Sequence, residues 1–585
     1  MERKLKLAIL TGQDSAATCQ TVSMLADLPE VEIVSILADV EPLPLKSRLR
    51  NLRRNIRREG IGYVWYRLFD FVREAEERLA QRLVSQEKIS KVLQESFPER
   101  PRCLADLGRQ RNIPILHVGN LNRAEAAKAL RELDSDLGIV LGTRILKRST
   151  FAVPRMGCIN LHKGKVPEYR GMPPGFWELY DSQNSATVTV HMVDDHLDTG
   201  DVIGTQSISI HPKDTPATLR KKLDRTGSEV LSRCVAQWAQ GKIELRPQRS
   251  STLKARTSPT RRQRRELDAK LGINSDWSAS WPYVLKSLLY LAFFYGGIFR
   301  LVRAWRKLRG GKRACVLLYH RVNDQSEDPL TTSIEHFAEQ MAVLQRYYEV
   351  VPTSWIVEAA KTGRRLPDHS IAIHFDDCYQ DVYTNASRIL AQMRFPACCF
   401  ISSGYVETDR IFPHDAEKCP FPMPNLTVED LLGLTRRGFS VGAHTVTHAD
   451  LGQCSYEQAI YEVVESKNDL EKYLHCIIPF FSYPYGEKKN IRDEVVELVR
   501  QSGYQALFSA YGGYFDAKSD LYDVPRWSVS SRFRPLDLLM EIEGLSISAF
   551  KRRWTAALSR RGKVEKRAIQ VPLRERRELT DNKRA

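Results

Sequence analysis

The chain has 585 residues and a formal net charge of +17, with 42% hydrophobic and 27% charged residues. This composition excludes an intrinsically disordered chain, and the length exceeds what one hydrophobic core ordinarily supports, so we expect at least two globular domains. The positive charge favours anionic partners such as nucleotides, lipid headgroups, folate polyglutamate or RNA, without selecting one. The 11 cysteines show no CxxC pair and no regular spacing, which indicates reduced thiols in a cytoplasm rather than disulfides.

Residues 1–245 predict a mostly parallel sheet covered by helices, because short apolar segments alternate with helical or loop segments. The apolar segments are LKLAILTG, VEIVSILADV, NIPILHV, DLGIVLG, GCINLH and ATVTVHMV. Residues from about 45 to 94 are charged and carry apolar positions at helical spacing, so they predict helices. The apolar part of MERKLKLAILTG is too short for the hydrophobic region of a signal peptide, so we expect no secretion.

Residues 246–311 predict a basic linker that contains an apolar helix. The uninterrupted apolar run from Leu288 to Phe299 is shorter than a membrane span. Both flanks of the wider segment 281–303 are basic, whereas a spanning helix should have asymmetric charge. Two structures fit the segment: a helix in the surface of an anionic membrane, or a helix packed on its own domain.

Residues 312–548 predict a barrel, because strands and helices alternate again from Ala314 onward. The strand-like segments are ACVLLYH, SIAIHFDD, ACCFISS, FSVGAHT, IPFFSYPYG, ALFSAY and DVPRWSV. Most of them end in polar or chemically capable residues, so the functional groups are expected at the C-terminal ends of the strands. Residues 549–585 are basic and low in apolar content, which predicts a disordered tail.

Two pairs of polar residues follow strands of the predicted barrel. Asp376 and Asp377 end one strand, and His444 and His448 follow another, four residues apart. Both imidazoles reach one cation if that segment turns helically. Two histidines and one carboxylate leave coordination positions open for water and substrate. We therefore predict a metal site with Asp377 as a ligand and Asp376 free as a general base, while a backbone N–H near Tyr485 helps to hold an oxyanion.

The motifs HFDDCYQD, AHTVTH, FSYPYG and VPRWSV resemble, in order, those of the polysaccharide deacetylase family (NodB homology, carbohydrate esterase family 4). The resemblance covers roughly residues 314–545 and implies a distorted (β/α) barrel, a divalent metal, commonly zinc, and deacylation of N-acyl amino sugars. It implies that Asp376 is the base and that the metal ligands are Asp377, His444 and His448. The chain has Ser482 where the family often has arginine, and no histidine follows His475. His320, in LYHRV, is therefore the candidate general acid.

A second constellation lies in the first half of the chain. Asn160 and His162 are two residues apart on a strand-like segment and therefore share a face, and Asp198 lies in a later turn. A carboxamide, an imidazole and a carboxylate together can bind an oxyanion and move protons in acyl transfer, although each is more often structural when taken singly. The loop after His162 contributes Tyr169 and Arg170 as candidate substrate contacts.

This second constellation resembles the catalytic trio of the formyltransferases that use 10-formyltetrahydrofolate, over about residues 4–241. The resemblance implies that a substrate amine attacks the formyl group directly. Asn160 and His162 would stabilise the tetrahedral intermediate, and Asp198 would tune His162. The folate is expected against Gly142, Thr143, Arg144, Ile145 and Leu146. The expected fold is α/β: a Rossmann-like formyltransferase sheet followed by a distorted (β/α) barrel of the deacetylase type.

The leading hypothesis is a bifunctional enzyme of amino-sugar or glycan metabolism, with formyl transfer to a substrate amine and metal-dependent N-deacylation. The expected substrate is a nucleotide- or lipid-linked amino sugar, handled in the cytoplasm or at the inner face of the cytoplasmic membrane. Two alternatives stay open: a methionyl-tRNA-type formyltransferase with an accessory hydrolase domain, and a non-catalytic binding protein on two enzyme folds. No segment after Gly241 suggests a β-barrel suited to tRNA, so no nucleic-acid partner is expected.

Overall fold

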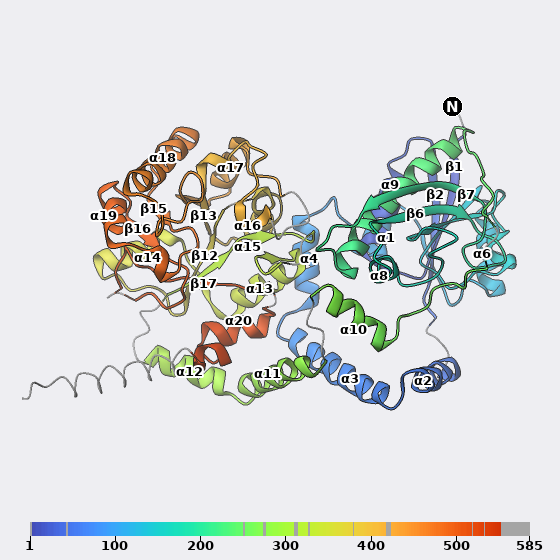
Figure 1. The fold of residues 1–585 in the computed structure, drawn as a ribbon, viewed down its shortest axis with the longest axis horizontal. Coiled ribbons are helices and arrows are strands. Elements are labelled where there is room, and N and C mark those ends of the chain that lie inside the picture. The colour runs from blue at the N-terminus through green and yellow to red at the C-terminus, as the bar shows by residue number, and fades with distance from the viewer. Residues whose placement is uncertain are drawn as a thin grey trace, which may run out of the picture.

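Two α/β lobes, joined by a row of helices, make up the fold (Figure 1). The computed structural model describes residues 3–41, 45–249, 252–272, 277–308, 314–325, 328–377, 379–416, 423–516, 519–531 and 533–551. Residues 552–585, most of the predicted tail, lie outside this range.

The N-terminal lobe is built on a seven-stranded sheet with the order β3-β2-β1-β4-β5-β6-β7. Its strands are β1 (Leu5–Thr11), β2 (Val31–Asp39), β3 (Ile115–Val118), β4 (Leu137–Leu141), β5 (Cys158–His162), β6 (Ser185–Met192) and β7 (Val202–Ser209). Neighbours from β3 to β5 pair in parallel, and β6 and β7 are antiparallel. The six predicted strands are confirmed. The edge strand β7 was not predicted, because its half-exposed sequence VIGTQSIS lacks a strong apolar signal.

Helices cover both faces of this sheet. They are α1 (Ala16–Ala26), α5 (Leu104–Arg111), α6 (Ala124–Glu132), α7 (Arg148–Phe151), α8 (Phe176–Tyr180) and α9 (Pro216–Ala239). The longest, α9, begins where Thr215 caps the backbone N–H of Thr218 and Pro216 occupies the first turn. The strand order reverses between β1 and β4, and in such sheets the crevice at the carboxyl ends near the reversal is where ligands bind.

Among the helices between β2 and β3 are α2 (Leu45–Glu59), α3 (Gly62–Gln81) and α4 (Gln86–Ser96), of which α4 ties the two lobes together. The apolar side of α4 is buried in the core of the C-terminal lobe, where Leu93 and Phe97 belong to the same hydrophobic cluster as that lobe's strands. Glu99 forms an ion pair with Arg388, and Arg346 donates a hydrogen bond of 2.9 Å to the Leu83 carbonyl. A segment of the N-terminal half therefore completes the C-terminal core.

The segment predicted to be a linker also makes specific contacts. It contains α10 (Arg261–Lys270), α11 (Trp277–Tyr295) and α12 (Ile298–Leu308). Before α10, Arg256 pairs through its backbone with Gly171 of the N-terminal lobe. Within the described chain, no single helix has the length and apolarity to cross a membrane, but Val284–Tyr295 and Ile298–Leu308 meet that criterion as a pair bent by 57°.

The C-terminal lobe is a curled parallel sheet with the order β16-β15-β14-β13-β12-β8-β17. Its strands are β8 (Cys315–Tyr319), β12 (Ser370–Phe375), β13 (Cys398–Ile401), β14 (Ser440–Ala443), β15 (Phe480–Ser482), β16 (Ala506–Phe508) and β17 (Trp527–Ser528), and β11 (Glu349–Val350) pairs with β12. A backbone bridge between Phe508 and Val524 links the two ends of the sheet. All seven predicted strands and the barrel-like architecture are confirmed.

Helices surround the curled sheet on its outside (Figure 1). They are α13 (Ile334–Tyr347), α14 (Thr353–Thr362), α15 (Ser387–Met393), α16 (Pro413–Ala416), α17 (Val428–Arg436), α18 (Tyr456–Leu474), α19 (Asp493–Gln501) and α20 (Pro535–Ile542). Two very short strands, β9 (Arg321–Val322) and β10 (Thr331–Thr332), pair with each other beside the sheet.

Candidate active sites

The carboxyl ends of the C-terminal strands bring the predicted deacetylase residues together. Asp376 and Asp377 follow β12, His444 follows β14, and His320 follows β8. All strands of the sheet run parallel, so these ends meet at one edge. Burial lowers the pKa of His320, whereas the negative charges of Asp377 and Asp376 act to raise it. The His320 imidazole is therefore close enough to both carboxylates to feel their charge.

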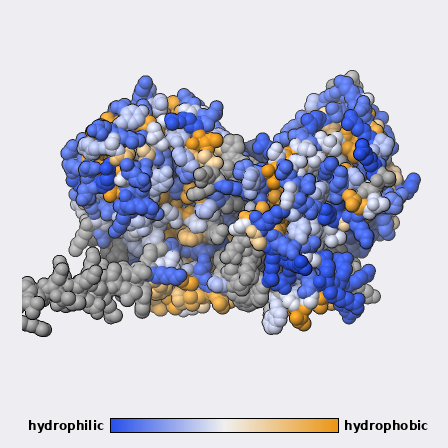
Figure 2. Space-filling view, viewed as in Figure 1, coloured by the Kyte–Doolittle hydropathy of each residue, from blue (hydrophilic) through white to orange (hydrophobic). Residues whose placement is uncertain are grey.

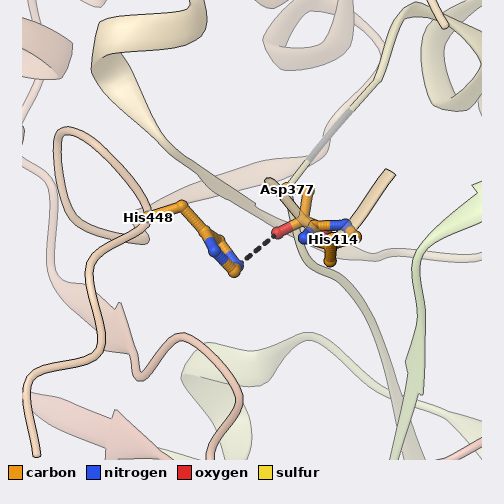
Figure 3. Close-up of side chains that lie close together, drawn as sticks. All are labelled: Asp377, His414 and His448. Carbon is orange, nitrogen blue, oxygen red and sulfur yellow. Dashed lines mark ion pairs between the residues drawn. The ribbon is translucent and has the colours of Figure 1, made fainter. Parts of the chain in front are cut away.

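The Asp377 carboxylate is the centre of the site. His448 Nε2 lies 3.1 Å and His444 Nε2 lies 3.4 Å from its Oδ1. His414 Nε2 lies 3.4 Å from Oδ2. The ligand atoms of Asp377, His414 and His448 lie within 4.8 Å of one another, and Figure 3 shows the two imidazoles on either side of the carboxylate. His414, on the short helix α16, was not predicted.

The residues present fit a divalent cation. Asp377 is 4% exposed, and its Oδ1 accepts no hydrogen bond from the described residues. Burial opposes ionisation of this carboxyl, but His448, His414 and His444 outweigh it and hold its pKa well below the usual value. A buried anionic oxygen surrounded by imidazole nitrogens is a donor set that suits zinc.

The turn that carries His444 and His448 is not helical, although both imidazoles still reach Asp377. Thr445 and His448 have φ values of 67° and 60°, in the left-handed region. The N–H groups of Val446 and Thr447 both donate hydrogen bonds of 2.8 Å to the buried carboxylate of Glu462 on α18. Glu462 thereby fixes an irregular turn in which both imidazoles face Asp377.

His444 is oriented by a partner behind it. Its Nδ1–H donates a hydrogen bond of 2.8 Å to the Ser482 carbonyl, which leaves Nε2 directed at Asp377. Burial lowers the pKa of His444, but Asp376 and Asp377 outweigh it, so the net shift is upward. His414 is engaged differently, since its Nε2 lies 3.2 Å from the Tyr379 hydroxyl.

Asp376 is held by an ion pair that was not predicted. Arg526 approaches it with both terminal nitrogens, with 2.7 Å from Nη1 to Oδ1 and 2.7 Å from Nη2 to Oδ2. Arg526 is fully buried, and it also donates to the Ser482 hydroxyl at 2.6 Å and to the Ser509 carbonyl at 2.8 Å. Burial raises the pKa of Asp376, but Arg526 and His444 outweigh it and lower it overall. Arg526 thus supplies the guanidinium that is missing at position 482.

Tyr485 lies at the rim of the site. Its ring centroid is 5.1 Å from that of His448, its side chain is 48% exposed, and its backbone is left-handed with φ 63°. An exposed aromatic ring beside buried imidazoles is suited to contact with a substrate.

The predicted formyltransferase residues also meet at the carboxyl ends of strands. A cavity of about 440 Å³ is lined by Gly142, Thr143, Arg144, Ile145, Leu146, Asn160, His162 and Asp198, among others. The side chains of Tyr169 and Arg170 are not part of this lining. The Tyr169 hydroxyl donates to Asp181 at 3.2 Å, and Arg170 donates to the Leu253 carbonyl at 2.6 Å. These two side chains support the loop rather than face the cavity.

Backbone groups hold His162 and Asp198. His162 Nε2–H donates to the Tyr169 carbonyl at 2.8 Å, and Nδ1 lies 3.5 Å from Asp198 Oδ2. The Gly171 N–H donates to the same carboxylate oxygen at 3.0 Å. Burial lowers the pKa of His162. The pKa of Asp198 is also lowered, because His191, His162 and the Gly171 N–H outweigh the opposing effect of burial.

His191, on β6, is a member of this site that was not predicted. Its Nδ1 lies 2.7 Å from the Met192 carbonyl and therefore carries the proton, so Nε2 accepts from Asn160 Nδ2 at 3.2 Å. Asn160 and His191 are directly opposite each other in the antiparallel pair β5–β6. This contact fixes which way the Asn160 carboxamide points.

The two lobes carry two different classes of enzyme domain. Residues 73–235 match the family model described as formyl transferase, and residues 363–507 match the one described as polysaccharide deacetylase. Both predicted resemblances are confirmed.

Particular relatives cover only parts of the chain. A methionyl-tRNA formyltransferase from Kosmotoga olearia is 30% identical over 149 residues, which is 25% of this chain and 48% of the relative. One from Geobacter metallireducens is 34% identical over 126 residues, 21% of this chain and 40% of the relative. The chain therefore spans less than half the length of these relatives.

Two solved structures each match about two fifths of the chain. A Streptococcus pyogenes deacetylase in complex with acetate is 21% identical with a TM-score of 0.35, covering 39% of this chain and 98% of that one. A phosphoribosylglycinamide formyltransferase from Bacillus halodurans is 14% identical with a TM-score of 0.27, covering 40% of this chain and 94% of that one.

Measuring how well variants retain metal distinguishes the roles of His444 and His414. We expect His444→Ala to abolish stoichiometric metal binding, because His444 is buried and its free nitrogen is aimed at Asp377. His414→Ala should weaken binding only about 10- to 100-fold, since its Nε2 is shared with Tyr379. Metal analysis after dialysis, with chelator competition, measures both. The reverse order of losses would instead make His414 the principal ligand.

Proposed function

We propose that this chain is a bifunctional enzyme of amino-sugar metabolism that transfers a formyl group to an amine and hydrolyses an N-acyl group. The observation that supports this most is the presence of two separate sets of polar side chains, each buried at the carboxyl ends of parallel strands. Because α4 packs into the core of the opposite lobe, both sites are held on one body.

For deacylation, we assign the cation to Asp377, His444 and His448, with zinc as the expected metal. When bound, it would polarise the acyl carbonyl and acidify a water molecule. Asp376 accepts the proton of the attacking water at Oδ1, because this oxygen keeps a lone pair beyond its hydrogen bond to Arg526, whereas Oδ2 also accepts from the Ser482 hydroxyl at 3.3 Å. The backbone N–H near Tyr485 faces the developing oxyanion, and His320 returns a proton to the departing amine.

For formyl transfer, the cavity of about 440 Å³ fits the formyl-bearing end of 10-formyltetrahydrofolate, which carries the one-carbon group. The backbone from Gly142 to Leu146 lines one side, and Asn160 and His162 line the other. The Asn160 carboxamide, held by His191, donates to the oxyanion that forms when the amine attacks. His162, positioned against Asp198, takes up the proton that the amine loses.

The substrate that joins the two reactions is an amino sugar, linked to a nucleotide or a lipid. Deacylation exposes an amine and formylation caps one, so the product of one site is of the right class for the other, and one chain raises its effective concentration. We place the enzyme in the cytoplasm or at the inner face of the cytoplasmic membrane. In support, the cysteines within the described ranges are all free, as expected in a reducing compartment.

Asp376→Asn tests the hydrolytic half. Wild-type protein should release acyl groups from a nucleotide- or lipid-linked N-acyl amino sugar, and this variant should lose about 10²- to 10⁴-fold in kcat because Asn cannot accept the proton. Formyl transfer from 10-formyltetrahydrofolate should be unchanged in the same preparation. Product analysis over a panel of amino sugars measures both reactions. Wild-type kcat in the variant would remove the base assignment, and an inactive wild type on every sugar would count against the function.

A methionyl-tRNA-type formyltransferase is the second candidate, because the relatives above carry that name and the chain is strongly basic. Those matches cover about a quarter of the chain, and the deacetylase lobe has no part in that reaction. Salt-dependent binding and formylation of methionyl-tRNA would favour it over the sugar.

A further inference from the structure

Three helices from two distant parts of the sequence form one apolar surface. Figure 1 shows α3, α11 and α12 in a row along the lower edge of the molecule, with α2 at one end. α3 contacts α11, and α11 contacts α12. Orange, apolar residues gather at this edge in Figure 2. The surface therefore combines an insertion of the N-terminal lobe with the segment between the lobes.

α11 is apolar on both of its sides. Its inner side packs on the C-terminal lobe, where Val284, Tyr290 and Leu291 are buried. Its outer side exposes Leu285 by 59%, Leu288 by 41%, Leu289 by 40% and Tyr295 by 55%. These outer positions are spaced three, four and seven residues apart, so they form one stripe.

The neighbouring helices continue this stripe. On α12, Ile298, Leu301 and Leu308 are exposed, Leu301 by 70%, while Arg303 and Arg306 point inward to the buried Glu543. On and just before α3, the exposed apolar side chains among the described residues are Ile61, Val64, Trp65, Phe71 and Leu79. We call the exposed apolar residues of α3, α11 and α12 the helix platform. Contiguous apolar surface of this kind usually marks an interaction site.

Positive charge borders the helix platform. α2 exposes Arg50, Arg53, Arg54 and Arg57, and Glu59 at its C-terminal end is the only acid in the helix. α12 adds Arg300 on its exposed side, and also Lys307, which pairs with Asp368 at 3.5 Å. α3 adds no net positive charge, because its sequence has three arginines and four acidic residues, of which Asp70 is paired with Arg67. Apolar side chains bordered by arginine and lysine are the chemistry that recognises an anionic lipid surface.

We propose that the helix platform is a docking surface for an anionic phospholipid bilayer, with α3, α11 and α12 lying in its interface. The bent pair α11–α12 does not cross the bilayer, because one side of it is committed to protein contacts. Arg303 and Arg306 pair with Glu543 at 3.1 and 2.5 Å, and Tyr290 and Phe299 are buried in the C-terminal core. A spanning pair would have to break these contacts.

A second copy of the chain is a less suitable partner. In a two-fold dimer each platform would face itself, so the exposed arginines of α2 and α12 would approach arginines of the same two helices in the other copy. Like charges brought together in this way oppose association, whereas a negative lipid surface attracts them. The binding itself depends on neither reaction.

Vesicle flotation of the full-length chain tests this proposal. Wild-type protein should float with vesicles of phosphatidylcholine mixed with phosphatidylglycerol, bind phosphatidylcholine alone at least about tenfold more weakly, and dissociate progressively as salt is raised. Leu285→Ser/Leu301→Ser on α11 and α12, and separately Trp65→Ser/Phe71→Ser on α3, should each lower the affinity about tenfold or more. If α3 and the α11–α12 pair form one binding surface, both double substitutions must weaken vesicle binding.

Ile477→Ser/Ile411→Ser is the matched control, since both side chains are exposed, by 75% and 58%, and lie in the C-terminal lobe away from the helix platform. This variant should bind vesicles as wild type does, and formyl transfer in solution should be unchanged in every variant that folds. Failure of wild type to bind anionic vesicles would overturn the proposal, as would unchanged binding in both platform variants. A dimer that the platform substitutions convert to a monomer would show that a second copy covers this surface.

Discussion

Arg526→Met should abolish deacylation and destabilise the C-terminal lobe by about 3–5 kcal/mol. Arg526 compensates the buried charge of Asp376 through two hydrogen bonds of 2.7 Å. Without the guanidinium, Asp376 lies buried beside the negative Asp377, and its pKa must rise. Urea unfolding of the C-terminal lobe, followed together with release of the acyl group, measures both effects.

A double variant distinguishes the destabilising effect of an uncompensated carboxylate from the loss of catalytic activity. Adding Asp376→Asn to Arg526→Met removes the uncompensated carboxylate, so the double variant should be more stable than Arg526→Met alone while remaining inactive. Arg526→Lys keeps the positive charge but loses the two-point geometry, so it should retain stability better than activity. If Arg526→Met proved as stable and as active as wild type, the ion pair would have no role in holding Asp376.

Local sequence patterns were sufficient to predict which strands carry the chemistry. Asp376, Asp377 and His444 each stand directly after an apolar run, and parallel strands present such positions at one edge of the sheet. The same reasoning placed Asn160 and His162 on one face of a strand that ends in the formyltransferase cavity. These predictions required only the period of a strand and the direction of its neighbours.

Residues that contact the sites from distant segments of the chain could not be predicted in this way. Arg526 meets Asp376 from 150 residues further along the chain, and nothing near either residue specifies the other. His414 lies in a short helix after an irregular loop, where no strand fixes its direction. His191 reaches Asn160 only because β5 and β6 pair in antiparallel register. The burial of α4 in the opposite lobe likewise depends on tertiary surfaces that no local pattern contains.

Asp198→Asn should reduce formyl transfer about 10²- to 10³-fold while leaving deacylation unchanged. Asp198 Oδ2 accepts the Gly171 N–H at 3.0 Å and lies 3.5 Å from His162 Nδ1, so it both shapes the loop and favours the protonated imidazole. Asn keeps the size and one acceptor but loses the charge that stabilises His162 after it takes up a proton. Steady-state kinetics with 10-formyltetrahydrofolate and the accepted amine should show the loss in kcat rather than KM, because the charge matters most in the transition state.

Asp195→Asn is the matched control for this charge. Asp195 is a neighbouring carboxylate that forms an exposed ion pair of 3.3 Å with Arg148, and such pairs contribute little. Asp195→Asn should therefore leave formyl transfer and deacylation unchanged. A loss of deacylation in Asp198→Asn would mean that the substitution disturbs the whole molecule, and equal kinetics in the two variants would remove Asp198 from the mechanism. A selective loss would instead show that the two lobes, although joined through α4, carry out their chemistry independently.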